Sequence, residues 1–127
     1  MTMKRISRLI AVALSAAALC SCADRSDDVR HIILWTFADG LTQEEKDAVL
    51  DRLEDTVAEL EDKVPGAVDF KLVYKGRMES SNCDFMFDFV FEDEAALKAF
   101  STNPDHKAAQ AELKPYLKGR VCLDVAR

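Results

Sequence analysis

The feature that most constrains the fold is a strict alternation in Cys83–Phe91, where phenylalanine occupies every second position from 85 to 91. A period of two residues places these rings on one face of a β-strand. A face this apolar is unfavourable in water, so a second layer of structure must cover it. The other face carries Asp84, Met86, Asp88 and Val90, a mixture that a monomer can leave in water and a dimer can cover.

Three further segments have the composition of strands. Residues 31–37 are β-branched, aromatic and apolar on both faces, which is typical of a central strand buried on two sides. Residues 67–75 alternate apolar and polar side chains, and their polar face predicts an edge strand. Residues 120–126 form the last predicted strand. These segments and the phenylalanine strand supply one complete sheet.

The first two helices are predicted from their start signals. Thr42 and Glu45 form a capping box, and an apolar stripe at helical spacing follows over residues 49–64. Pro65 and the glycine after it end this helix. Asp93 is expected to cap a second, shorter helix, which suits the acidic residues around it.

A third helix begins at Asn103 and Pro104. Asparagine is a preferred N-cap, and proline at the first helical position has no N–H to leave unpaired. His106 follows within the first turn and shares an apolar stripe with Ala109, Leu113 and Leu117. The histidine is therefore expected to point inward, either as a hydrogen-bonded core residue or as part of a site.

The order strand, helix, strand, strand, helix, strand predicts an α+β fold of the ferredoxin-like, split β-α-β kind, with a four-stranded antiparallel sheet and its helices on one face. The first and third strands are central, and the last lies beside the first.

Cys83 and Cys122 are then separated by an intervening strand, about 10 Å apart, beyond the reach of a disulfide. No Cys-x-x-Cys spacing occurs, so a redox motif or zinc knuckle is not supported.

The amino-terminal residues predict export. Basic residues at positions 4, 5 and 8 precede an apolar run of 11 residues, Leu9–Leu19, which is too short to span a bilayer and is typical of a cleaved signal peptide. The sequence Leu19-Cys20-Ser21-Cys22 resembles a bacterial lipobox, so residues 1–22 are interpreted as a lipoprotein signal with Cys22 as the lipidated residue. Ordinary secretion is the alternative. We expect the protein to be anchored to a bacterial membrane, in the periplasm or cell envelope.

The predicted mature chain is strongly acidic. Removal of residues 1–21 takes away three basic residues and moves the formal net charge from −6 to −9. Such a domain lacks the basic surface that nucleic acid requires.

Residues 23–30 are polar without an apolar pattern and are interpreted as a tether, and residues 31–126 as one domain. A domain of this size has little surplus core and gains from burying a further face in a partner.

Together, several motifs resemble the stress-responsive dimeric A/B barrel (Dabb) family. They are the opening strand His31-Ile-Ile-Leu-Trp-Thr-Phe, the Thr-x-x-Glu helix start, Val64-Pro65-Gly66, the aromatic third strand and Asn103-Pro104-Asp105-His106. The resemblance covers 31–125. It implies a homodimer in which two subunits pack sheet against sheet, and it assigns the mixed face of the phenylalanine strand to the interior of that barrel.

The family includes a plant polyketide cyclase, and the resemblance implies roles for two histidines. The position matching His106 is its base, and the position matching His31 supplies a second polar group. A tyrosine that assists the base matches Phe100, and a third-strand histidine matches Phe85. Without the tyrosine hydroxyl, a group that holds the reacting oxygen is missing, so cyclase chemistry by that route is not expected.

A pocket between the helices and the sheet is predicted, with His106 as its polar contributor. Small-molecule sites are typically apolar clefts with a few placed polar groups. The alternative is that the same side chains fill one another's space as an ordinary core. The predicted lining consists of Ile33, Trp35, Val49, Leu50, Leu53, Phe85, Phe87, Phe100, Leu117 and Cys122.

Two functions from different classes follow. The first is a homodimeric module that binds a small apolar ligand or has a structural role, without turnover. The second is a cofactor-free enzyme, a cyclase-like lyase or a small monooxygenase, with His106 as general base. No cofactor is predicted. No metal site is predicted either, because His31 and His106 without a fixed third ligand fall short of a zinc set.

Overall fold

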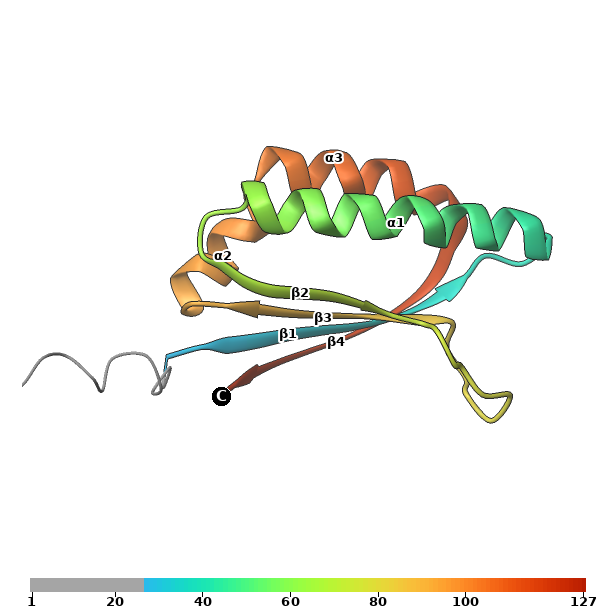
Figure 1. Cartoon of the computed structure of the whole chain (residues 1–127), viewed down its shortest axis with the longest axis horizontal. Coiled ribbons are helices and arrows are strands. Elements are labelled where there is room, and N and C mark those ends of the chain that lie inside the picture. The colour runs from blue at the N-terminus through green and yellow to red at the C-terminus, as the bar shows by residue number, and fades with distance from the viewer. Residues whose placement is uncertain (1–26) are drawn as a thin grey trace, which may run out of the picture.

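The computed structural model describes residues 27–127, so the predicted signal peptide, the lipobox with Cys22 and the first half of the tether lie outside the described residues. Four antiparallel strands form one sheet in the order β2-β3-β1-β4, and the helices cover one of its faces (Figure 1). This confirms the predicted ferredoxin-like α+β fold. The elements are β1 (Val29–Phe37), α1 (Gln43–Lys63), β2 (Ala67–Val73), β3 (Phe85–Phe91), α2 (Glu94–Thr102), α3 (Pro104–Leu113), a 3-10 turn (Lys114–Tyr116) and β4 (Leu117–Ala126).

The central strand β1 pairs with β3 on one side and with β4 on the other. Ile33, for example, lies between Phe87 and Cys122. The strand β1 therefore separates β3 from β4 as predicted, and Cys83 and Cys122 are both free thiols. Within residues 27–127 there is no helix with the length and hydropathy needed to cross a membrane.

The helix starts lie where the capping signals predicted them. The Thr42 hydroxyl accepts a hydrogen bond from the backbone N–H of Glu45 at 3.1 Å. The Asp93 carboxylate accepts from the backbone N–H of Ala96 at 2.8 Å. Each cap satisfies a donor that the first turn of a helix leaves without a partner. These local bonds fix where α1 and α2 begin over the sheet.

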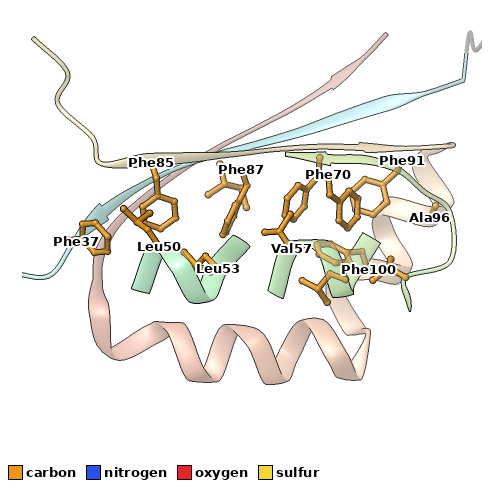
Figure 2. Packing of buried hydrophobic residues seen from close by; sticks show 14 residues of the cluster. Phe37, Leu50, Leu53, Val57, Phe70, Phe85, Phe87, Phe91, Ala96 and Phe100 are labelled. Atoms are coloured by element: carbon orange, nitrogen blue, oxygen red, sulfur yellow. The ribbon is translucent and has the colours of Figure 1, made fainter. Parts of the chain in front are cut away.

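The core lies between β3 and the helices. The four phenylalanines of β3 point toward α1 and α2, as predicted, and are 0–9% exposed (Figure 2). Phe70 from β2 stacks on Phe89 with ring centroids 4.1 Å apart. From α1 the core receives Leu50, Leu53 and Val57. The aromatic face of β3 is thus covered inside one chain.

The structure differs from the sequence-based boundaries where β1 and β4 begin. β1 begins at Val29, so the last two residues of the predicted tether belong to the sheet, where the charge of Arg30 is paired with Asp88 at 2.8 Å. β4 begins at Leu117 rather than at residue 120. Gly119 lies inside β4 opposite Thr36, beside an irregularity in the register.

Candidate functional site

A cavity of about 530 Å³ lies between the helices α1 and α3 and the half of the sheet formed by β1 and β4. Its size is in the range of small-molecule sites, about 300–1,000 Å³. Every helix and three of the four strands contribute to its wall. Seven predicted site residues lie in that wall, and they are Ile33, Trp35, Leu53, Phe87, Phe100, His106 and Leu117.

Four residues predicted to line the pocket lie elsewhere. Leu50 and Phe85 are buried in the packed core, at 8% and 2% exposure, and fill space between α1 and β3. Val49 borders a separate groove between α1 and α3. Cys122 lies on β4 and is exposed. The prediction was wrong for these four because helical and strand periodicity gives the inward face of an element but not the position along it where packing ends.

The cavity exists because α3 brings little side-chain volume to the sheet. None of the residues of α3, all of which the structure describes, is buried. His106, Ala109 and Leu113 face inward as the predicted stripe requires, yet each remains only half-buried. Alanine is too short to reach β1 and β4 from the helix axis. The space that α1 fills with leucine and valine is therefore left open under α3.

Asn103 fixes the start of α3 and thereby the position of His106. Its side-chain oxygen accepts hydrogen bonds from the backbone N–H groups of Asp105 and His106, at 2.9 and 3.2 Å. The preceding helix α2 ends one residue earlier, so the chain turns sharply at the cap. This turn brings the imidazole of His106 over the ring of Phe100, with centroids 3.7 Å apart and planes 13° apart.

The hydrogen bonding of His106 defines its proton position. Nδ1 lies 2.8 Å from the backbone carbonyl oxygen of Phe100, and because a carbonyl oxygen only accepts, Nδ1 donates. Burial is the main cause that lowers the pKa of His106. The Phe100 carbonyl raises it by less, and His31 and Arg120 lower it further. A neutral imidazole with its proton on Nδ1 has its lone pair on Nε2, which no hydrogen bond occupies within residues 27–127.

Basic side chains gather at the cavity of this acidic protein. Lys107, Lys114, Lys118 and Arg120 line it, and its wall contains no aspartate or glutamate. The Arg120 guanidinium lies 5.9 Å from the centroid of the Trp35 ring. Sequence reasoning missed this cluster. The overall negative charge of the chain gave no reason to expect a basic cluster. The cluster could have been predicted from the positions of these residues, which fall in the third helix and in the segment around the start of the last strand.

His31 does not line the cavity. Its side chain is buried on β1, and Nδ1 contacts the Asp124 carboxylate at 2.5 Å. Its imidazole packs nearly perpendicular to the ring of Phe100, with centroids 6.3 Å apart. The two predicted catalytic residues therefore contact the same aromatic ring. No hydrogen bond joins His31 to His106.

The sheet order and the one-sided helices define a ferredoxin-like α+β domain with a cavity under its last helix. The chain belongs to the stress-responsive A/B barrel domain family (Dabb), whose model matches residues 29–126. A comparison with curated protein sequences gives no match.

Solved structures share the fold at low sequence identity. A dimeric protein of unknown function from Bacteroides fragilis has a TM-score of 0.72 and 22% identity, over 79% of this chain and 96% of its own. A Dabb family protein from Mesorhizobium loti has a TM-score of 0.59 and 20% identity, over 79% and 96%. A hydroxynitrile lyase from Passiflora edulis has a TM-score of 0.65 and 17% identity, over 80% and 94%.

Proposed function

We propose that this protein is a homodimeric module that binds a small apolar molecule carrying an acidic group, such as an aromatic or aliphatic carboxylate. One observation carries the proposal: an open, mainly apolar cavity whose charged wall residues are all basic. Burial of the apolar body of such a ligand supplies affinity, and the basic groups supply orientation.

Arg120 is the strongest candidate for the anion contact. It approaches the cavity from β4 beside Trp35, and its guanidinium is suited to a bidentate carboxylate contact. Lys118, by contrast, is already paired with Asp39 at 2.6 Å. His106 presents Nε2 as an acceptor and adds a polar contact for a hydroxyl group of the ligand.

Ligand-induced shifts in melting temperature test this proposal. Aromatic carboxylates are compared with their primary amides, which match them in shape but have no charge. The acids are expected to raise the melting temperature more than the amides do. Arg120→Met should weaken acid binding about tenfold or more, because a charge-assisted hydrogen bond is lost. Lys98→Met is the control, since Lys98 is an exposed residue of α2 outside the cavity wall.

A cavity-filling variant separates a binding site from a loosely packed core. Ala109→Leu places additional carbon atoms in the cavity and should abolish binding of the acids. If no acid stabilises the wild type while Ala109→Leu raises its stability, the cavity is a packing defect and the proposal fails.

The second candidate function is catalysis with His106 as general base. The observation that favours it is the neutral imidazole whose Nε2 lone pair is free at the cavity wall. A general base needs such an atom within hydrogen-bond reach of its substrate. His106→Ala distinguishes the two functions, because an enzyme loses turnover whereas a binding module loses only affinity.

The proposed dimer uses the face of the sheet that carries no helix (Figure 1). Val121, Leu123 and Val125 of β4 expose 63%, 57% and 40% of their surface there. The charged groups on this face are paired within the chain, since Arg30 bonds Asp88 at 2.8 and 3.2 Å. Several solved structures of the same fold are described as dimeric.

Sedimentation of Leu123→Asp tests the dimer. A carboxylate buried without a partner in the interface should weaken association at least about 100-fold and give a monomer at micromolar concentration. Met78→Asp is the control, because Met78 is 69% exposed in the connection between β2 and β3. A wild-type chain that is monomeric at micromolar concentration excludes this arrangement.

Export and lipid anchoring remain part of the proposal. Mass spectrometry of the membrane fraction should find a lipid-modified amino-terminal cysteine at position 22. Cys22→Ser should release the protein from the membrane. A Cys22→Ser protein that stays membrane-bound, or a soluble wild type, would contradict the anchor.

A further inference from the structure

A second cluster of polar side chains lies beside Phe100, and none of its members lines the cavity. His31 on β1 is directly opposite Asp124 on β4 in the strand register, and Cys122 lies two residues before Asp124 on the same face of β4. Their donor atoms form a triangle. His31 Nδ1 is 2.5 Å from Asp124 Oδ1, and Cys122 Sγ is 3.8 Å from His31 Nδ1 and 3.7 Å from Asp124 Oδ1.

The geometry does not suit a nucleophilic cysteine. In a relay, histidine accepts from the nucleophile on one ring nitrogen and donates to the carboxylate from the other. Here Cys122 and Asp124 both approach Nδ1 of His31. Three donors that converge on one point instead resemble one side of a metal coordination sphere.

We infer that His31, Cys122 and Asp124 form a binding site for Zn²⁺ or a similar borderline divalent cation. Imidazole nitrogen, thiolate sulfur and carboxylate oxygen are the ligands that zinc takes in proteins, whereas Mg²⁺ and Ca²⁺ prefer oxygen alone. In tetrahedral coordination, bond lengths of about 2.0–2.3 Å place neighbouring ligand atoms about 3.3–3.8 Å apart. The two distances to sulfur already fall in this range.

Binding requires one short contact to open. The hydrogen bond between His31 and Asp124 must give way, and the Asp124 side chain is 51% exposed on the edge strand β4, where it is free to move. The imidazole proton moves from Nδ1 to Nε2, and the Cys122 thiol releases one proton to solvent. Thiolate and carboxylate then balance the charge of the cation. Three protein ligands leave the fourth position to water on the exposed side.

Cobalt substitution tests this site directly. Cys20 and Cys22 are replaced by serine in every full-length protein compared, so that Cys83 and Cys122 are the only thiols. One equivalent of Co²⁺ is expected to give a sulfur-to-cobalt charge-transfer band in the near ultraviolet and tetrahedral d–d bands in the visible, and one equivalent of Zn²⁺ should displace it. Cys122→Ser should remove the charge-transfer band.

Matched controls exist for two ligands. Cys83→Ser removes the other described thiol, and His106→Ala removes the only other histidine, so both should retain the band. Asp124→Asn preserves the shape of the ligand and should weaken Co²⁺ and Zn²⁺ binding about tenfold or more. Circular dichroism establishes that each variant is folded. A folded wild type without the band, or a band that persists in Cys122→Ser, overturns the inference.

Discussion

The two halves of this small domain are packed very differently. Where α1 and α2 cover β3, the four phenylalanines of that strand are 0–9% exposed, and their rings contact one another and Phe100 (Figure 2). Where α3 faces β4, the structure describes every residue of both elements and none is buried. The first half therefore provides the stability of the fold. The second half is free to hold a cavity and exposed donor atoms.

The difference originates in side-chain volume. The inward stripe of α1 is leucine and valine, whereas the corresponding stripe of α3 includes Ala109. Both helices have N-caps, and both lie on the same face of the sheet (Figure 1). Local signals thus fix the position of each helix, and the size of its inward residues decides whether the space beneath it is core or cavity.

Truncation of one residue from each half gives the largest expected contrast. Phe91→Ala should cost about 3–5 kcal/mol of unfolding free energy, because Phe91 is fully enclosed. Leu113→Ala should cost about 1 kcal/mol, because Leu113 already borders open space. Urea unfolding at one fixed protein concentration measures both, since a dimer makes stability depend on concentration. Equal costs would show that the halves are packed alike.

Removal of a helix cap should affect the open half locally. Asn103→Ala removes the acceptor for two backbone N–H groups of α3 and should cost about 1 kcal/mol. Because α3 has no buried residue to hold it, hydrogen exchange of its amides should accelerate. Asp93→Ala is the matched change in α2, whose Phe100 is buried. If the amides of α2 lose as much protection from hydrogen exchange in Asp93→Ala as those of α3 lose in Asn103→Ala, packing does not distinguish the two helices.

The smallest effect concerns the pH dependence of stability. Burial holds the pKa of His106 below its usual value of about 6.5, so the unfolded chain binds this proton more readily than the folded one. The stability from the neutral imidazole is complete above about pH 6.5 and is lost as the pH falls through the folded pKa. Wild type should therefore lose stability relative to His106→Phe on acidification. Urea midpoints at several pH values measure this, and a constant difference would contradict it.

Much of the fold was predictable because its signals are local. The alternating phenylalanines determined the inward face of β3, and Thr42, Asp93 and Asn103 marked the starts of the three helices. Seven of the predicted site residues line the cavity, because facing inward under α3 is also a local property. The boundary between cavity and core was not predictable for Leu50 or Phe85, since it depends on how far neighbouring elements fill the space.

The cluster of His31, Cys122 and Asp124 shows a different limit. These residues come from strands about 90 positions apart, and only the register between β1 and β4 brings them together. The predicted strand order already placed the last strand beside the first. A shift of one residue, however, would turn Cys122 and Asp124 to the opposite face of the sheet. Register is determined by the whole sheet and by the irregularity near Thr36, which no local pattern indicates.

Phe100 is shared by the cavity and by the cluster of His31, Cys122 and Asp124. Its ring stacks on the imidazole of His106 and packs nearly perpendicular to the imidazole of His31, so one side chain contacts both histidines. Any replacement of Phe100 therefore changes the surroundings of both His106 and His31. A loss of ligand binding or of metal binding in such a variant could not be assigned to one site. Separation of the two sites requires changes that leave Phe100 intact, such as Ala109→Leu in the cavity and Cys122→Ser in the cluster.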